Sequence, residues 1–326
     1  MQTRAIPVSS LSADQVHSVL TAATAAPSLH NTQPWTFHCT PTTIELHADP
    51  TRTAPVADPE QRELRLSCGA ALLNLRLAIR VLGVHPAVQL LPDHHQPDLL
   101  AVIRPQGHSV VTPLDIELFR AITRRHTNRR PFSTNDVPSS VVNRLRQAAK
   151  IEQAFMASLA GPQLRTLRAL INQAHDIQLR DPAFVAEFAH WTGRDNTCRT
   201  GVPARSSGLL PEPQDQWVLR DFSGGQAHSR VEGKDFETEP LIAVIGTFHD
   251  LPLAHLQAGQ AMQRVLLAAT AAGLAASFLS EVVEVPATRK QLRDLVVGGL
   301  WPQTVLRLGR PTAAVTAPAR FTAALD

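Results

Sequence analysis

Two stretches of one pattern decide the fold: SCGAALLNLRLAIRVLG at 67–83 and AGQAMQRVLLAATAAG at 258–273. When the stretches are aligned, Gly69 falls on Gly259 and Gly83 falls on Gly273. In both, apolar residues recur at i, i+3 or i+4 and i+7, which is the spacing of one helix face. Each stretch is therefore predicted to be a helix closed by its C-terminal glycine. The small residues along both predict close helix packing.

The match extends to the segments on either side of the two helices. After each helix comes an apolar strand stopped by Arg-Pro, at 99–105 and at 304–311. Before each comes another helix, at about 14–26 and at about 141–156. The sequence at 12–15, Ser-Ala-Asp-Gln, has the pattern of a capping box before the first of these.

We therefore predict an α+β fold that contains one unit twice, over residues 1–108 and again over residues 113–326. The alternative is a coincidence between two helices rich in Ala and Leu. The second copy contains an insertion at 161–239 with Trp191, Trp217, several Phe and Arg, and many Gly and Pro. Because it is too aromatic for a disordered linker, we predict an ordered excursion or lid.

The composition is that of a folded globular protein. Of 326 residues, 44% are hydrophobic and 18% charged, and the formal net charge of +3 is too small to indicate a nucleic-acid partner by itself. Cys39, Cys68 and Cys198 lie far apart and form no CxxC, so a reducing cytoplasm fits better than a disulfide framework or a zinc knuckle. No secretion signal or membrane-spanning window is visible, so we expect a cytoplasmic protein without a membrane partner.

Several common catalytic motifs are absent from the sequence. GxGxxG, GxxxxGK[ST], HExxH and GxSxG do not occur, which removes the main support for the corresponding nucleotide-binding, protease and hydrolase functions. His94 and His95, beside Asp93 and Asp98, could bind a metal, but a solvated polar loop is the preferred interpretation. We expect Cys68 to be buried as a small apolar residue. No metal site is predicted.

The first segment that could carry chemistry is APSLHNTQPWTF at 26–37, directly after the first helix. Two prolines restrict its backbone, Ser, Asn, Thr and Gln supply short polar groups, and Trp35 begins a strand that would anchor the loop. Such a loop can present amides to a flat polar ring. An ordinary Asx-type turn between helix and strand explains the spacing equally well.

The second segment is TRRHTNRRPF at 123–132, which contains four arginines. Guanidinium groups, with the hydroxyl of Thr127, can surround the oxygens of a phosphate. A nucleic-acid patch built from Arg124, Arg125, Arg129 and Arg130 is the alternative. No aromatic residues interleave with these arginines, which disfavours that alternative.

Together these motifs resemble the FMN-dependent nitroreductases. The segment Ala-Pro-Ser-x-x-Asn-x-Gln-Pro-Trp, followed by a small-residue helix ending in Gly, is similar to their loop, and RHTNR at 125–129 resembles their flavin-binding basic opening. The loop survives in the first copy and the basic opening in the second, an arrangement similar to the Acg-like fused proteins of actinobacteria. The resemblance implies a nitroreductase-like fold of central antiparallel or mixed sheets flanked by helices, and one FMN held between the two copies of a monomeric, internally paired chain.

The resemblance also implies the residues of the site. Arg125 and Thr127 would meet the flavin phosphate and ribityl chain, Arg129 the pyrimidine edge, and Arg320 the phosphate again. The full set of implied cofactor-binding residues is Pro27, Ser28, Leu29, Asn31, Arg125, His126, Thr127, Arg129, Leu279, Ser280, Glu281 and Arg320.

The implied activity is an NAD(P)H-dependent reduction of a nitro or quinone-type small molecule. Flavin N5 carries the hydride in such a reaction, so no protein nucleophile or general base is expected. The alternative is an FMN storage protein in which the insertion covers the flavin and keeps nicotinamides out. Neither function needs nucleic acid as a partner.

Overall fold

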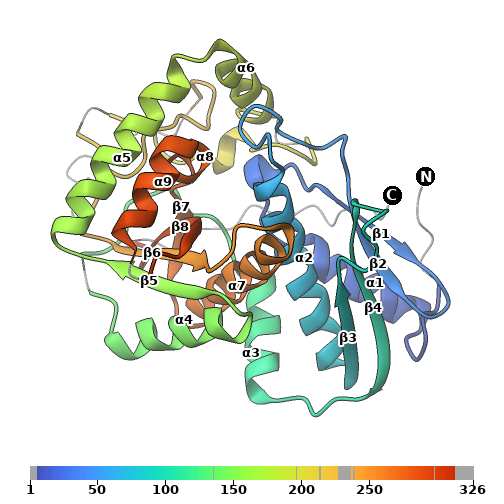
Figure 1. The fold of residues 1–326 in the computed structure, drawn as a ribbon. Helices are drawn as coiled ribbons and strands as arrows, with labels where there is room; N and C mark the ends of the chain where they lie inside the picture. Colours follow the sequence, from blue (N-terminus) through green and yellow to red (C-terminus); the bar gives the residue numbers. More distant parts are fainter. Residues whose placement is uncertain are drawn as a thin grey trace.

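The computed structural model describes residues 6–134, 136–195, 197–212, 214–226, 236–237, 239–296 and 298–312. Figure 1 shows two sheets on opposite sides of a central layer that contains α2 and α7. Within the described residues, no helix is long and apolar enough to cross a membrane.

The first sheet has four antiparallel strands in the order β1-β2-β4-β3. Its elements in chain order are α1 (Ala13–Thr24), the 3-10 turn η1 (Leu29–Asn31), β1 (Trp35–Cys39), β2 (Ile44–Ala48), α2 (Arg62–Val81), β3 (Val84–Leu90) and β4 (Leu99–His108). Alternate residues of β2 are buried, which places one face of this sheet on the helices.

The second sheet repeats this order as β5-β6-β8-β7, again with every pair antiparallel. After α3 (Pro113–Ile122), its elements are α4 (Ser139–Ile151), β5 (Phe155–Leu159), α5 (Pro162–Leu179), α6 (Pro182–Trp191), the turn η2 (Ala204–Ser206), β6 (Leu241–Thr247), α7 (Pro252–Ala271), β7 (Ala275–Phe278), α8 (Glu281–Glu284), α9 (Pro286–Leu295) and β8 (Trp301–Gly309). The identical strand order confirms the duplicated α+β unit that the sequence predicts.

The central helices α2 and α7 are 20 residues long each and pack directly on one another at Gly69 and Gly259. A Cβ on Gly69 would lie 2.3 Å from the carbonyl oxygen of Leu256, and one on Gly259 would lie 2.1 Å from that of Leu66. No side chain fits in this space, so the paired glycines set the distance between the two halves. A buried bond from Gln263 to Asn74, 2.8 Å long, joins the same helices.

Local signals account for several element boundaries. Ser12 and Gln15 form the predicted capping box at the start of α1. Gly83 and Gly273 follow the caps of α2 and α7 with φ of 78° and 76°, a conformation that favours glycine.

Two predicted boundaries are wrong. The helix predicted at 141–156 ends at Ile151, because Gln153 takes a left-handed conformation with φ of 62° and residues 155–159 form β5. The first predicted strand continues past Pro105 to His108. It can do so because β2 pairs with β4 only as far as Ile103, so the missing N–H of this proline costs no ladder bond on that side.

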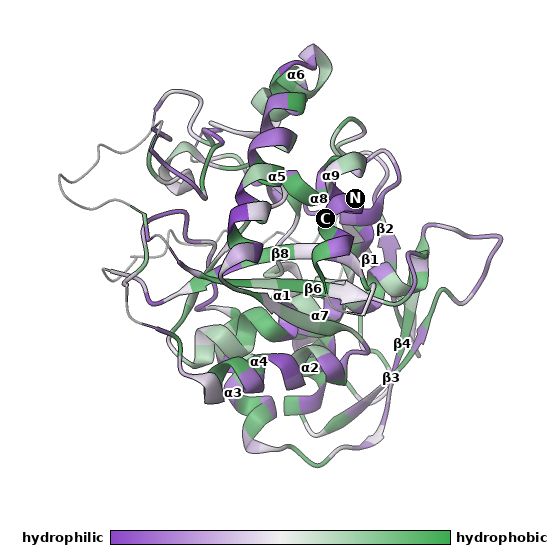
Figure 2. Cartoon of the chain, turned by 60° about the vertical axis from the view of Figure 1, so that its left-hand side comes forward, coloured by the Kyte–Doolittle hydropathy of each residue, from purple (hydrophilic) through white to green (hydrophobic). Residues whose placement is uncertain are grey.

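The insertion is ordered in its described part and joins β5 to β6, where the first copy has a short turn between β1 and β2. Helix α5 buries Leu164, Leu167 and Ile171 against the second sheet and α9. Figure 2 shows both hydrophilic and hydrophobic residues along α5, and its buried residues recur at helical spacing, as expected for a helix with one buried face. The insertion is therefore part of the core of the second half.

Candidate functional site

A cavity of about 950 Å³ lies where the two halves and the insertion meet. The end of α1, the loop that follows it and the start of α2 line one part of it. The segment after α3, the end of β7 and Met262 of α7 line another, and residues of the insertion line the third. This volume is at the upper end of the range for small-molecule and cofactor pockets.

The loop at 26–34 forms its part of the wall in a strained conformation. His30, Asn31 and Gln33 have φ of 46°, 58° and 51°, values that residues other than glycine rarely adopt. The hydroxyl of Ser28 accepts a 2.9 Å bond from the backbone N–H of Gln33, and Trp35 is buried at the start of β1. The predicted anchor is thus in place, and Pro27, Ser28, Leu29 and Asn31 all line the cavity.

The arginine segment reaches the same cavity from the other half. The side chain of Arg125 is buried in the wall, while His126, Thr127 and Arg129 are partly exposed and also line it. Thr127 forms an isolated parallel bridge with Ala276, which holds the segment beside β7. The two motifs, about a hundred residues apart in sequence, therefore face one space.

Arg129 is held more firmly than the sequence suggests. Its guanidinium donates a 3.0 Å bond to the carbonyl oxygen of Ser206 and lies 4.1 Å from the centre of the Phe222 ring. Burial lowers the pKa of Arg129 to about 10, so the group stays charged at neutral pH. Gly208 allows this packing, since a Cβ there would lie 2.8 Å from the Cβ of Arg129.

At the end of β7, the structure brings one of the three residues implied by the resemblance, Ser280, to the cavity. Phe278 and Ser280 line the cavity. Leu279 is buried in the core of the second half, and its backbone N–H donates to the carbonyl of Val305 at 2.9 Å. Glu281 is also buried, and burial raises its pKa. Arg320 lies outside the described residues.

The insertion contacts the loop at 26–34 through hydrogen bonds that the sequence did not indicate. The side-chain amide of Asn31 donates to the carbonyl oxygen of Gly201 at 3.0 Å, and that of Gln33 donates to Arg199 at 2.6 Å. The ring of His30 packs edge-on against Phe188, with 5.3 Å between centroids. The side-chain amide of Asn31 is therefore hydrogen-bonded to the insertion.

A buried ion pair fixes the insertion to α8 behind the cavity. The guanidinium of Arg220 donates to the carboxylate of Glu284, to Gln178 at 2.6 Å and to the hydroxyl of Ser280 at 3.2 Å. Burial alone would raise the pKa of Glu284, but Arg220 lowers it to about 2. Ser280 thus links this pair to the cavity wall.

Two further titratable groups line the cavity, and burial disfavours the charged form of each. Burial lowers the pKa of His30 to about 4, so its ring is neutral at neutral pH. Burial raises the pKa of Glu63 to about 7, although the guanidinium of Arg62 lies 2.5 Å from its carboxylate. Sequence spacing singled out neither residue, because both shifts depend on burial by distant segments.

The related position of the second copy is filled by charged side chains. Ala25 caps α1 and lines the cavity, and the corresponding cap of α4 is Glu152. The buried carboxylate of Glu152 accepts bonds of 2.6 Å from Arg76 and 2.8 Å from Arg264. The connection to β5 is also short, since α4 ends at Ile151 and β5 begins at Phe155.

The chain is similar in sequence to several known proteins. No protein-family model matches the chain. It is 35% identical over 298 residues to the protein named "Putative NAD(P)H nitroreductase Rv3131" of Mycobacterium tuberculosis H37Rv, covering 91% of this chain and 85% of the relative. It is 29% identical over 306 residues to "Putative NAD(P)H nitroreductase acg" of the same strain, covering 93% and 91%.

Among solved structures, the chain is similar to the FMN-dependent nitroreductase NfnB from Mycobacterium smegmatis, determined in complex with NADPH. The identity is 16%, the TM-score is 0.36, and the match covers 61% of this chain and 90% of that one. The identity to Rv3131 extends over nearly the whole length of both sequences, including both halves of the doubled fold. This chain belongs to the NAD(P)H nitroreductase family that includes Rv3131.

Proposed function

We propose that the chain is an FMN-dependent oxidoreductase with one flavin in the cavity between its halves. NAD(P)H would be the reductant, and a nitro or quinone-type small molecule the acceptor. The observation that carries this proposal is that the Pro-Ser-Asn loop of the first half and the arginine segment of the second line one cavity. The names of the relatives, NAD(P)H nitroreductases, support the same activity.

The donors present in the cavity fit a flavin mononucleotide. Arg125 supplies a buried guanidinium and Thr127 a hydroxyl, a combination suited to a phosphate and its ribityl chain. The loop around Pro27 and Leu29 offers an apolar and amide surface of the kind that a flat ring can contact. Arg129 offers a second positive charge in the lining of the same space.

When bound, FMN supplies the hydride-accepting centre, and the protein supplies orientation and charge. Arg129 would stabilise negative charge on the reduced ring, because Ser206 and Phe222 already hold its guanidinium in place and no reorganisation is needed. His30 stays neutral at neutral pH and adds no second positive charge beside it.

One flavin per chain follows from the unequal halves. The arginine segment and the Pro-Ser-Asn loop each occur once. At the related position of the second copy, Glu152 with Arg76 and Arg264 fills the space beside the helix cap. A titration of the purified protein with FMN should therefore reach saturation at one equivalent.

The contribution of Arg125 can be tested against its neighbour in sequence. Arg125→Ala removes charge-assisted contacts worth about 1.5–3 kcal/mol, so FMN affinity should fall roughly 10- to 100-fold. Arg124→Ala is the matched control, because Arg124 is exposed and donates to the carbonyl of Thr270 outside the cavity. Equal loss of FMN from both variants, each with a wild-type circular dichroism spectrum, would contradict this placement of the phosphate.

Storage of flavin without turnover is the second candidate function. It is favoured by the contacts of Asn31 and Gln33 with the insertion, which hold the insertion against the cavity. The flavin-loaded protein should be mixed with NADPH under anaerobic conditions while the flavin absorbance is followed. Bleaching within seconds to minutes, reversed by a nitroaromatic or quinone, supports the reductase, whereas persistent yellow colour supports storage.

A further inference from the structure

A second group of ligand-type side chains lies on the first sheet. The strand β2 alternates, with Ile44, Leu46 and Ala48 buried against the core and the two residues between them partly exposed. Those two residues are Glu45 and His47, which therefore project from the outer face of the sheet.

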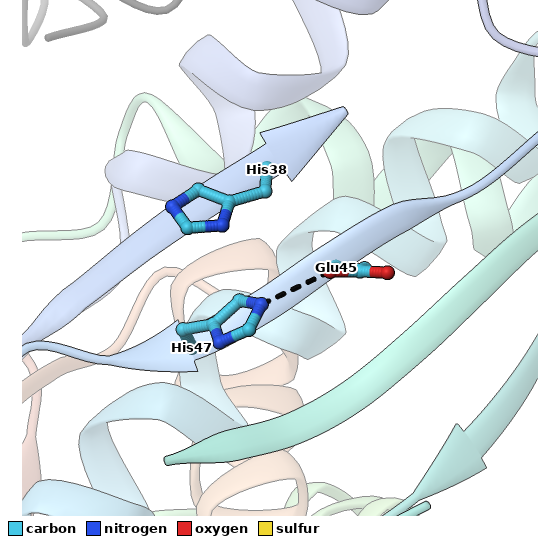
Figure 3. Close-up of side chains that lie close together, drawn as sticks. All are labelled: His38, Glu45 and His47. Carbon is cyan, nitrogen blue, oxygen red and sulfur yellow. Dashed lines mark hydrogen bonds and ion pairs between the residues drawn. The ribbon is translucent and has the colours of Figure 1, made fainter. Parts of the chain in front are cut away.

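The neighbouring strand β1 adds a third side chain to this face. In the antiparallel register His38 lies directly opposite Glu45, so the two side chains project to the same side. Figure 3 shows the imidazole of His38 on β1 beside that of His47 on β2, with Glu45 next to them. The two imidazole centroids are 4.5 Å apart.

The distances within this group suit a divalent cation. One ligand atom from each of the three residues can be chosen so that all lie within 4.8 Å of one another, and Nε2 of His47 is 3.1 Å from a carboxylate oxygen of Glu45. Around a tetrahedral zinc ion with bonds of about 2.0–2.1 Å, neighbouring ligand atoms are about 3.3 Å apart. The ligand atoms would have to approach by up to about 1.5 Å to reach that spacing, and His38, the exposed member of the group, is the side chain with most room to move.

A second histidine pair among the described residues shows what this group adds. His94 and His95 are even closer, with 3.8 Å between centroids, and Asp93 is adjacent. The carboxylate of Asp93, however, accepts bonds from the backbone of His95 at 2.9 Å and from the side chain of Gln96 at 2.8 Å. The carboxylate of Asp93 is therefore hydrogen-bonded within its own turn, whereas that of Glu45 bonds to an imidazole that is itself a potential ligand.

We propose that His38, Glu45 and His47 bind one divalent transition-metal ion, of which Zn²⁺ is the expected occupant. Two imidazoles and one carboxylate are ligands that zinc prefers, and three protein ligands on one open face leave a further position for water. The spacing H-x6-E-x-H is set by strand pairing rather than by a helix turn. A bound ion would fasten the edge strand β1 to β2.

Zinc binding to the chelator-treated full-length protein tests the proposal by isothermal titration calorimetry. Wild type should bind one Zn²⁺ at this site, and His38→Ala and His47→Ala should each weaken binding by at least about tenfold. The matched control is the double variant His94→Ala/His95→Ala, which should bind zinc as wild type does. Co²⁺ should give a visible absorption band in the wild type and control that is lost in the two ligand variants.

Because the side chains of His38, Glu45 and His47 all reach solvent, His38→Ala and His47→Ala should melt near the wild-type temperature in the absence of metal. Added Zn²⁺ should raise the melting temperature of the wild type and of the control but not of His38→Ala or His47→Ala. Undiminished zinc binding in the ligand variants, loss of binding in the control, or absence of stoichiometric binding in the wild type would each overturn the proposal.

Discussion

Replacing Gly259 by alanine should separate the two central helices. The new Cβ would lie 2.1 Å from the carbonyl oxygen of Leu66 and 2.8 Å from its carbonyl carbon and Cα. These are backbone atoms of α2, so no side-chain rotation can relieve the contact. Reaching an ordinary distance of 3.4 Å requires α7 to move from α2 by about 1.3 Å.

The expected cost of Gly259→Ala is larger than the gain in helix propensity. Alanine favours a helix over glycine by about 1 kcal/mol. A gap of only 0.5–1 Å between two atoms in contact already loses roughly a quarter to a half of their dispersion energy. Because α2 and α7 bury most of their residues, many such contacts would be weakened together. We therefore expect a net loss of about 2–4 kcal/mol in the free energy of unfolding, or a melting temperature lower by about 3–6 °C.

Urea unfolding followed by circular dichroism measures this loss. Gln257→Ala, in the same helix at a half-buried position, is the control and should change stability by less than about 1 kcal/mol. Gly69→Ala should also destabilise, and the double variant should lose less than the sum of the two, because one separation of the helices relieves both contacts. A Gly259→Ala protein as stable as wild type would refute the reasoning.

Two further predictions concern buried carboxylates. Glu284→Ala removes the carboxylate that pairs with the buried guanidinium of Arg220. In a urea titration it should lower the free energy of unfolding by about 3–5 kcal/mol. The control, Glu117→Ala, breaks an exposed ion pair and should lower it by less than about 1 kcal/mol. Glu63 has a folded-state pKa of about 7, above its ordinary value of 4.5, so its stabilising effect is complete below pH 4.5 and is lost as pH rises through 7. Glu63→Gln should therefore gain stability relative to wild type between pH 5 and pH 8, by up to about 3 kcal/mol, and a constant difference across that range would contradict the buried position of the carboxylate.

The doubled fold was predictable because its signals are local and occur twice. Helix periodicity and a closing glycine mark α2 and α7, and the same positions hold Gly69 and Gly259. The end of α4 was missed because the sequence around Gln153 contains no glycine or proline, so nothing local marks its left-handed conformation.

The candidate site was predictable only where single segments carry it. The loop at 26–34 and the arginine segment each contain a compact group of polar residues, and both line the cavity. The part of the cavity wall that the insertion forms was not predictable from the sequence. It depends on pairings such as that of Arg220 with Glu284, which are 64 residues apart. Leu279 and Ser280 were both implied by their place in a motif, yet only Ser280 lines the cavity, with Phe278, while Leu279 is buried in the core of the second half.

Fusion of the two halves explains how the sites came to differ. In a symmetric homodimer every residue occurs in both related sites, so a substitution that closes one also closes the other. In this chain the cap of α1 is Ala25, which leaves room for the cavity, while the cap of α4 is Glu152, which draws Arg76 and Arg264 into a buried ion cluster. That cluster bridges α4 to both central helices. On our proposal of one flavin per chain, the second half therefore uses the position related to the flavin cavity for a structural contact.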